Sequence, residues 1–341
     1  MSSFPSVLPE PDITPLRGGP VLRWGVMAPG GIAGSFVRAL LAETDQRVVA
    51  VGSRSIERAE EFATRNGIER AYGGYEEVAT DPEVDIVYIA APHTGHRDLA
   101  LMAIAAGKHV LVEKPIGVSL DDAREIADAA RSAGVYVMEA MWSRFIPQTS
   151  VISQLLRDDV LGDLRLVTAD FSVLFPYDPG SRLFDPALGG GVLLDLGVYT
   201  AWFCHFVLGE PLSVTAIGSL APTGVDAQAA VTLGYETDAQ AVFTTGGFAA
   251  GTGAGLIAGH EARIEVDKFM SPSGFRLIAG DRELRWDDPK GPEWNHGLAY
   301  QAVAVAADIA AGRTESPLHS LDDTMAIMRV LEESRLQLGA A

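Results

Sequence analysis

The feature that most constrains the fold of this chain is an alternation of strand-like and helical segments between Leu22 and Met138. Apolar runs rich in Val, Ile and Ala alternate with stretches of helical pattern, and glycines such as Gly67 and Gly107 follow the helical stretches. Nearly continuous apolar runs are typical of parallel strands buried on both faces. A glycine just beyond a helix is a common stop signal. The alternation therefore predicts an α/β fold, an open and doubly wound parallel sheet.

Beyond about residue 143 the pattern changes. Strand-like segments separated by Gly, Pro and Asp follow one another, and two helical segments close the chain. Consecutive strands of this kind predict a mostly antiparallel sheet with helices on one face, an α+β domain. We expect an N-terminal arm over residues 1–20, a parallel-sheet domain over 21–143 and a second domain over 144–341.

Charge and cysteine content narrow the possible partners and the compartment. The 341 residues carry a net charge of −19, which argues against binding to nucleic acid or to an anionic membrane surface. We see no apolar run of membrane-spanning length. The single cysteine, Cys204, cannot form an internal disulfide, which favours a reducing compartment. The Pro-rich N-terminus lacks the pattern of a signal peptide, so we expect a flexible or draped arm and a cytoplasmic protein.

The glycine-rich turn after the first strand-like segment resembles a phosphate-binding loop. The dinucleotide fingerprint G-x-G-x-x-G needs small residues for a tight turn, for close approach to pyrophosphate and for helix packing. Its three positions are occupied here by Ala28, Gly30 and Ala33, so the first glycine is replaced. A strand precedes the loop and a helix follows it, which favours dinucleotide binding over a simple turn. The residues expected to contact the cofactor are Ala28, Pro29, Gly30, Gly31 and Ile32.

The end of the second strand-like segment bears on which cofactor is used. NAD sites usually place Asp or Glu there, whereas NADP sites use Arg to accept the 2′-phosphate. This chain has Ser53 and Arg54 at that point, with Arg58 one helical turn later and no acid before Glu57. We therefore favour NADP(H) over NAD(H). The alternative is that both arginines are ordinary solvated residues at the start of a helix.

Three polar residues suggest proton-transfer chemistry. Glu113, Lys114 and Pro115 end a strand-like segment at the sheet edge where open α/β folds bind ligands. Asp195 and Tyr199 lie four residues apart in an apolar segment, so on an α-helix they would share one face. A buried acid needs a partner. The positive charge of Lys114 would favour the phenolate of Tyr199, and hydride transfer from an alcohol needs such a base.

The segments "GGIA", "EKP" and "GGGVLLDLGVY", in this order, resemble the glucose–fructose oxidoreductase/inositol dehydrogenase (Gfo/Idh/MocA) family. The resemblance runs from Arg23 to about Arg335. "YVMEAMWSRFIP" and the Asp-x-x-x-Tyr pair are most similar to its dihydrodiol dehydrogenase and NADP-dependent xylose dehydrogenase branch. It implies a Rossmann domain, an open-faced sheet domain, and homodimers or homotetramers formed through that sheet. It also implies proton transfer by Lys114 and Tyr199, with Asp195 orienting the substrate or the lysine.

The loop "APHTGH" is a second candidate for cofactor contact. Its histidines are three residues apart, which invites a metal-site reading, but no third ligand is nearby in the sequence. The resemblance implies that Pro92 and His93 contact the cofactor and that His96 begins the next helix. The cofactor candidates here are Ala91, Pro92, His93 and His96, and we expect no metal site.

Three further residues are candidates for substrate binding. Trp142 and Arg144 would stack on a sugar ring and bind its hydroxyls, or else pack at a domain hinge; the sequence leaves both open. Arg182 lies in a Pro/Gly-rich loop of the kind that covers a substrate.

These observations predict an NADP-dependent oxidoreductase that moves hydride between nicotinamide and a carbinol or carbonyl carbon of a sugar, polyol or cyclic diol. One alternative keeps the fold and uses retained NAD(P) for transient oxidation in glycoside cleavage or elimination. A second alternative is a non-catalytic sensor of a dinucleotide or sugar.

Overall fold

The computed structural model describes residues 4–291 and 293–341, which divide into two compact units. The parallel-sheet unit comprises Ile13–Phe145 and Trp294–Met325. The mixed-sheet unit comprises Ile146–Glu293, Ala326–Ala341 and the described residues of the first twelve. Each unit has its own sheet and its own buried core.

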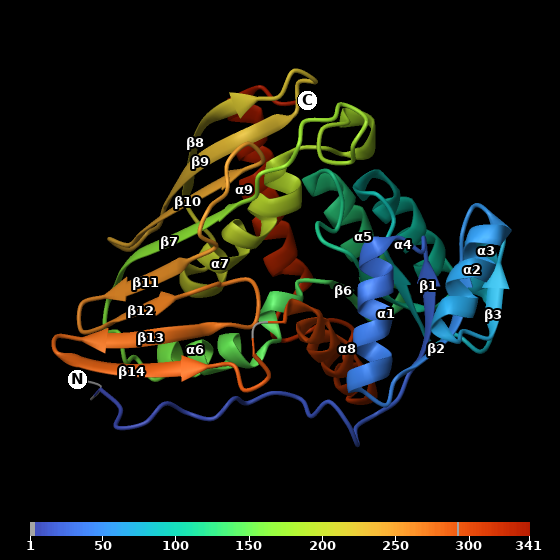
Figure 1. Ribbon diagram of the computed structural model, residues 1–341, viewed down its shortest axis with the longest axis horizontal. Helices are drawn as coiled ribbons and strands as arrows, with labels where there is room; N and C mark the ends of the chain where they lie inside the picture. Colours follow the sequence, from blue (N-terminus) through green and yellow to red (C-terminus); the bar gives the residue numbers. More distant parts are fainter. Residues whose placement is uncertain (1–3, 292) are drawn as a thin grey trace. The chain divides into compact units, whose positions relative to one another are not determined.

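The parallel-sheet unit contains six parallel strands in the order β3-β2-β1-β4-β5-β6. Figure 1 labels β1, β2, β3 and β6 of this sheet. The strands are β1 (Arg23–Met27), β2 (Arg47–Gly52), β3 (Arg70–Tyr72), β4 (Ile86–Ile89), β5 (His109–Val112) and β6 (Val137–Glu139). This is the strand order of a Rossmann fold, with the switch point between β1 and β4. The predicted doubly wound sheet is confirmed.

The helices of this unit follow the predicted alternation. They are α1 (Gly31–Glu43), α2 (Ile56–Asn66), α3 (Glu76–Thr80), α4 (His96–Ala105) and α5 (Leu120–Ala133), with short 3-10 turns η1 (His93–Gly95) and η2 (Trp142–Arg144). Ser119 caps α5 by accepting a hydrogen bond from the amide of Asp122 at 3.1 Å, as its spacing predicts. Gly134 ends the same helix in the left-handed conformation, with φ of 65°.

One helix near the C-terminus lies in a different unit from the one that the sequence suggests. Helix α8 (Trp294–Ala310) packs against α1, and Tyr136 donates a hydrogen bond to Asp308 at 3.1 Å. The chain then passes through α9 (Leu321–Leu338), which begins in the parallel-sheet unit and ends in the mixed-sheet unit. The expected second domain, residues 144–341, differs from this division, because the chain returns to the parallel-sheet unit at Trp294. Such a return leaves no pattern in the local sequence.

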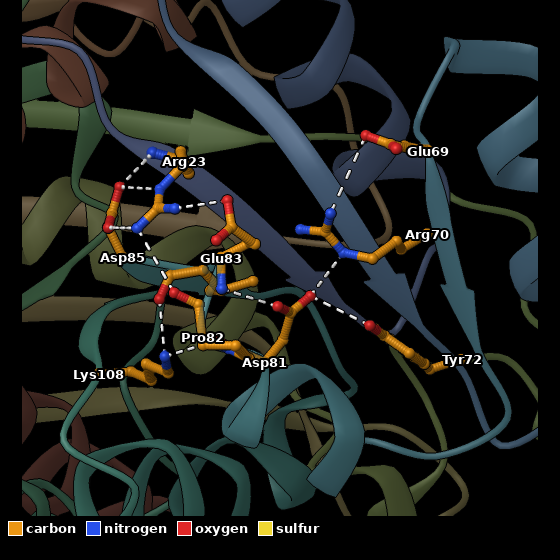
Figure 2. A network of polar contacts seen from close by, with 10 residues as sticks. Arg23, Glu69, Arg70, Tyr72, Asp81, Pro82, Glu83, Asp85 and Lys108 are labelled. Atoms are coloured by element: carbon orange, nitrogen blue, oxygen red, sulfur yellow. Dashed lines mark hydrogen bonds and ion pairs between the residues drawn. The ribbon is translucent and has the colours of Figure 1, made fainter.

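A network of ion pairs and hydrogen bonds connects the loops at the amino-terminal side of the parallel sheet (Figure 2). Arg23, which begins β1, donates to Asp85, which precedes β4, at 2.7 Å. Lys108 precedes β5 and donates to the carbonyl oxygens of Asp81 and Val84, both at 2.7 Å. These contacts join loops at the edge opposite to the carboxyl ends of the strands, where ligands bind in such folds.

The mixed-sheet unit contains eight strands in the order β14-β13-β12-β11-β7-β10-β9-β8, and only β7 and β10 pair in parallel. The strands are β7 (Leu164–Ser172), β8 (Ser213–Leu220), β9 (Asp226–Gly234), β10 (Gln240–Gly246), β11 (Gly255–Gly259), β12 (Arg263–Val266), β13 (Gly274–Ala279) and β14 (Arg282–Asp287). The predicted mostly antiparallel sheet is confirmed.

Alternation along the strands gives this sheet two different faces. Helix α7 (Val198–Leu208) packs on β7 and β10, against buried residues such as Val167 and Phe243. Alternate residues, among them Thr168 and Thr244, line a hollow of about 640 Å³ on the other face. The remaining helical segments of the unit are α6 (Pro147–Arg157), η3 (Pro186–Leu188), a π-helical turn η4 (Leu193–Gly197) and the end of α9.

The stretch Pro186–Leu208 corrects one expectation about apolar runs. By length and mean hydropathy, 1.5, it would suffice to cross a membrane, although the sequence analysis found no such run. However, 78% of its most apolar window is buried inside the structure. Core helices of globular units pass the same test, so the stretch is weak evidence for a membrane span.

The N-terminal arm is draped on both units. Phe4 lies under the guanidinium group of Arg282, 4.5 Å from the ring centre, and the Asp12 amide donates to the Ser150 hydroxyl at 2.8 Å. Further along, Arg17 forms an ion pair with Asp45 at 2.9 Å.

Candidate active site

The loop between β1 and α1 has the backbone geometry of a phosphate-binding turn. Ala28 has a φ of 64°, and its amide donates to the carbonyl oxygen of Gly52 at 3.1 Å. The Gly30 amide then donates to the carbonyl oxygen of Ala28 at 2.8 Å, which closes the turn. No side chain caps the first turn of α1, so its amides can receive an anion.

The backbone conformation of Ala28 explains why the dinucleotide fingerprint has a glycine at this position. A positive φ costs an L-residue about 1–2 kcal/mol, whereas glycine adopts it freely. The replacement therefore keeps the turn and adds local strain. Gly31 is open on the side where a side chain would stand, and Ala33 is fully buried where α1 meets the sheet. Two other residues of the loop, Pro29 after Ala28 and Ile32 after Gly31, are partly exposed.

The end of β2 presents cations and no free acid. Ser53 is buried, and its amide donates to the carbonyl oxygen of Tyr72 at 3.1 Å. Arg54 and Arg58 are exposed, and within the described part of the chain neither has an ion-pair partner. The first carboxylate after the strand, Glu57, accepts a hydrogen bond from Ser55 at 2.6 Å, which lowers the pKa of Glu57. The arrangement is suited to an anionic group.

His96 joins two loops at the carboxyl edge of the parallel sheet. Its side chain is fully buried, Nδ1 lies 2.8 Å from the carbonyl oxygen of Pro115, and Nε2 lies 2.8 Å from that of Ala91. Burial lowers the pKa of His96, although both carbonyls favour the protonated ring. Because both ring nitrogens already face backbone carbonyls, His96 connects the loops at Ala91 and Pro115 rather than offering a nitrogen to a ligand.

The neighbouring loop residues behave differently. His93 is buried beside His96, with ring centres 5.8 Å apart, while Pro92 is exposed and Ala91 is half-buried. Among residues 4–291 and 293–341, no group of three or more His, Cys, Asp or Glu side chains could hold a metal ion.

Two buried carboxylates hold the turn that carries Lys114. The Lys114–Pro115 bond is cis. Glu113 accepts hydrogen bonds from the Lys114 amide at 3.2 Å and from the Tyr88 hydroxyl at 2.5 Å. Burial raises the pKa of Glu113. Its carboxylate is thus used to shape the turn.

The second carboxylate, Glu139, is one that the sequence analysis missed. It accepts from the Ile116 amide at 2.9 Å, and its other oxygen lies 3.0 Å from Nε2 of His319. An acid at the end of the apolar run "VYVMEAM" was the available signal. Its partner His319 lies 180 residues away, so the pairing could not be read from the sequence.

The partner of Asp195 is Arg182. Asp195 is almost fully buried, and its two oxygens accept from Nη1 and Nη2 of Arg182, each at 3.0 Å. This is the planar, two-bond geometry that makes arginine the strongest carboxylate partner. Both residues were candidates from the sequence, which did not pair them. The arginine side chain itself remains half-exposed.

The backbone that carries Asp195 is not the regular α-helix that the four-residue spacing assumed. Leu193–Gly197 forms a π-helical turn, and α7 begins at Val198. The i, i+4 argument therefore does not describe this segment, and π-helical turns often occur at functional sites. Gly197 fits because a Cβ there would lie 3.2 Å from Leu193 and 3.4 Å from Thr245.

Tyr199 follows on the first turn of α7. Its ring is 6% exposed and meets Phe171 edge to face, with centres 5.8 Å apart. The mixed-sheet unit thus gathers Tyr199, Asp195 and Arg182 within one short region of chain, whereas Lys114 belongs to the parallel-sheet unit.

Trp142 and Arg144 lie in η2 of the parallel-sheet unit. The Trp142 ring is buried 6.2 Å from that of Trp294, and Arg144 donates to the carbonyl oxygen of Leu318 at 2.9 Å. Burial lowers the pKa of Arg144 to about 10. Both contacts lie within the parallel-sheet unit.

Comparison with known proteins agrees with this architecture. Residues 22–141 match the model of an oxidoreductase family with an NAD-binding Rossmann fold (GFO/IDH/MocA), and residues 150–266 match the GFO/IDH/MocA C-terminal domain. Trans-1,2-dihydrobenzene-1,2-diol dehydrogenase from Xenopus laevis is 38% identical over 93% of this chain and 98% of its own length.

Solved structures are also similar. An aldose-aldose oxidoreductase from Caulobacter crescentus has a TM-score of 0.82 at 25% identity, over 93% of this chain and 97% of that one. A 3-ketoreductase from Actinomadura kijaniata, in complex with NADP, has a TM-score of 0.80 at 26% identity, over the same shares of the two chains.

Proposed function

This chain belongs to the Gfo/Idh/MocA family of oxidoreductases, and we propose that it moves hydride between NADP(H) and a carbinol carbon of a sugar, polyol or cyclic diol. One observation carries the proposal above others. A buried phenol, Tyr199, follows four residues after Asp195, which is paired with the guanidinium group of Arg182, in a mostly apolar segment. Such a cluster is costly to bury and suits the recognition and deprotonation of a hydroxyl group.

The loops at the edge of the parallel sheet fit a dinucleotide. The uncapped amides of α1, with Gly30 and Gly31, would hold the pyrophosphate. Ala91, Pro92 and His93 would contact the nicotinamide half, with Glu113, Pro115 and His96 shaping that surface from within. The bound cofactor supplies the hydride acceptor, C4 of the nicotinamide.

The residues of this chain would handle the proton and the orientation. In the oxidation direction Tyr199 takes the hydroxyl proton, and in the reduction direction it returns the proton. We propose that Lys114, in the other unit, assists this proton transfer by favouring the phenolate through its charge. Asp195, held by Arg182, would accept a hydrogen bond from a neighbouring hydroxyl. A substrate with adjacent hydroxyls uses all of these groups.

The preference for NADP(H) rests on Arg54 and Arg58. Both are exposed beside the end of β2, and Glu57, the acid in between, is occupied by Ser55. Arginine binds a 2′-phosphate well, and an NAD site would offer a free carboxylate to the ribose instead.

The substrate class takes support from relatives named for a dihydrodiol and for aldoses. The hollowed face of the mixed sheet is the surface through which we expect homodimers or homotetramers to form. Cytoplasmic residence stays a prediction from the composition.

The experiment is a fluorescence titration with NADPH and NADH of the wild-type protein and of Arg54→Ala, Arg58→Ala and Arg65→Ala. Arg65 is the matched control, because it lies on α2 with Arg58 and pairs with Glu61 at 2.5 Å. Losing a phosphate contact should weaken NADPH roughly 10- to 100-fold in the first two variants and leave NADH unchanged. Tighter binding of NADH by the wild type would overturn the cofactor assignment.

Turnover then separates the remaining alternatives. Net reduction of NADP⁺ with D-xylose or trans-cyclohexane-1,2-diol supports a dehydrogenase. Conversion of substrate without net change in the cofactor would point to transient oxidation, and cofactor binding with no conversion of any sugar or diol would point to a sensor.

A further inference from the structure

Asp226, the first residue of β9, is a buried acid with no part in the reaction proposed above. Its side chain is fully buried, and Oδ2 accepts a hydrogen bond from the Leu193 amide at 2.6 Å. Leu193 is the first residue of the π-helical turn that carries Asp195. The other carboxylate oxygen lies 3.7 Å from Nε of Arg335 in α9. A distant strand thus fixes the start of the segment that carries the site.

The backbone around this contact is built to let the carboxylate approach. Gly191 has a φ of 118°, and a Cβ at that position would overlap the Asp226 carboxylate. A Cβ on Gly190 would lie 2.8 Å from the carbonyl oxygens of Leu183 and Asp185. Gly191 therefore allows the close approach of Asp226, and Gly190 allows that of the backbone at Leu183 and Asp185.

The same region fixes the loop that carries Arg182. Leu183 and Phe184 are buried in one apolar cluster with Val192 and with Val225 and Ala227, which flank Asp226. The Gly191 amide donates to the carbonyl oxygen of Leu183 at 2.8 Å, so the loop and the turn are also joined through their backbones. Arg182 comes directly before Leu183 and Phe184, which are buried in this cluster. Asp195 comes two residues after Leu193, whose amide donates to Asp226.

We propose that Asp226 is a positioning residue of the active site, which holds the π-helical turn so that Asp195 and Arg182 meet in their two-bond geometry. It acts through Leu193 and does not touch substrate. The expected effect of Asp226 on kinetics rests on the proposed function. Its expected effect on the structure of the π-helical turn does not depend on any reaction.

A carboxylate suits this task for a physical reason. It accepts from a backbone amide at the amino end of a helical segment, where negative charge is favourable. Neither water nor an apolar side chain would fix the amide with the same direction. Once Leu193 is released, the π-helical turn can relax toward regular helix, which would rotate Asp195 away from Arg182.

The test compares Asp226→Ala and Asp226→Asn with Asp238→Ala. Asp238 is the control, because it is exposed in the same unit and forms only a surface pair with Arg165 at 3.1 Å. Asn keeps an oxygen that can accept from Leu193, so it serves if the Ala variant does not fold. Hydrogen–deuterium exchange over residues 181–199 is the first readout.

We expect exchange in that segment to rise by roughly tenfold or more in Asp226→Ala and to stay at the wild-type level in Asp238→Ala. Asp226→Asn should lie between them. Unchanged exchange over residues 181–199 in a folded Asp226 variant would overturn the proposal, whatever the activity. This readout fails or succeeds separately from the proposed function, which depends on turnover.

Kinetics supply the second readout, with NADP⁺ and the probe alcohol that gives turnover. Asp226→Ala should lower kcat/KM roughly 10- to 100-fold while leaving the Kd for NADPH within about twofold. Combined with Arg182→Ala, it should add less than about threefold, because both changes remove the same arrangement. Full multiplication of the two effects would show that Asp226 acts on stability alone and would refute the positioning role.

Discussion

Arg182 and Asp195 are joined by two parallel hydrogen bonds, each 3.0 Å long, that link an otherwise irregular loop to a π-helical turn. The acid is 10% exposed in its side chain and the arginine 48%. The pair therefore spans from the interior to the surface. It places a carboxylate in an apolar region and binds a guanidinium group to both of its oxygens.

Replacement of Arg182 tests this relationship. Arg182→Lys keeps the charge but loses the planar fork, and Arg182→Ala leaves Asp195 without its partner. We expect kcat/KM to fall roughly tenfold for Lys and 100-fold or more for Ala, with the Kd for NADPH unchanged. Steady-state kinetics and a cofactor titration measure both. Arg165→Ala, which removes the exposed ion pairs with Asp163 and Asp238, is the control. Equal activity of the Lys variant and the wild type would show that only charge matters here.

Tyr199 and Lys114 are tested by removal of their polar groups alone. Tyr199→Phe keeps the edge-to-face contact with Phe171 but removes the proton carrier, and Lys114→Met keeps the length of the side chain. Each should lower kcat roughly 10²- to 10⁴-fold and leave binding of NADPH nearly intact.

Tyr177→Phe is the matched control for the phenol, because Tyr177 is exposed in the same unit. Its kcat should equal that of the wild type. If Tyr199→Phe turned over at the wild-type rate, another group would have to carry the proton.

The fold was predictable where the local pattern repeats. Each strand-like run between Leu22 and Met138 became a parallel strand or its immediate continuation, because burial on both faces leaves a continuous apolar signature. The Ala28 turn and the Lys114 turn were also found, since both follow such a strand directly.

What could not be predicted depends on contacts between distant segments. The return of α8 to the parallel-sheet unit, the pairing of Glu139 with His319 and that of Asp195 with Arg182 are set by tertiary packing. The π-helical turn is similar, because its shape follows from Asp226 and Gly197 packing against other strands. The four-residue spacing alone suggested a regular helix.

Ala28 offers a test of local strain. Ala28→Gly removes the cost of a positive φ, at the expense of greater freedom in the unfolded chain. The net effect should be a stabilisation of up to about 1 kcal/mol, seen as a rise of a few degrees in Tm, with binding of NADPH retained or improved. Ala33→Gly is the control. It should destabilise, because Ala33 is buried within α1. A lower Tm for Ala28→Gly would contradict the strained turn.

The network of Figure 2 predicts a loss of stability in acid. Burial alone would raise the pKa of Asp81, but hydrogen bonds from the Glu83 amide, Arg70 and Tyr72 outweigh it and lower the pKa. A carboxylate with a lowered pKa stabilises the fold above its unfolded value of about 3.9, and that contribution disappears as the pH falls through the folded value. Asp81→Asn should therefore cost about 1–3 kcal/mol at pH 7 and much less at about pH 3.

Urea unfolding of both proteins at the two pH values measures this difference. Asp121→Asn is the control, since Asp121 is exposed and pairs only with Arg124 at the surface, so its effect should be small at either pH. If the gap between wild type and Asp81→Asn were the same at both pH values, the lowered pKa of Asp81 would not be the source of its stabilisation. That result would mean that the hydrogen bond from Arg70, 2.7 Å long, stabilises the protonated acid as strongly as the ionised one. We do not expect this, because a guanidinium group binds a carboxylate more strongly than a neutral acid.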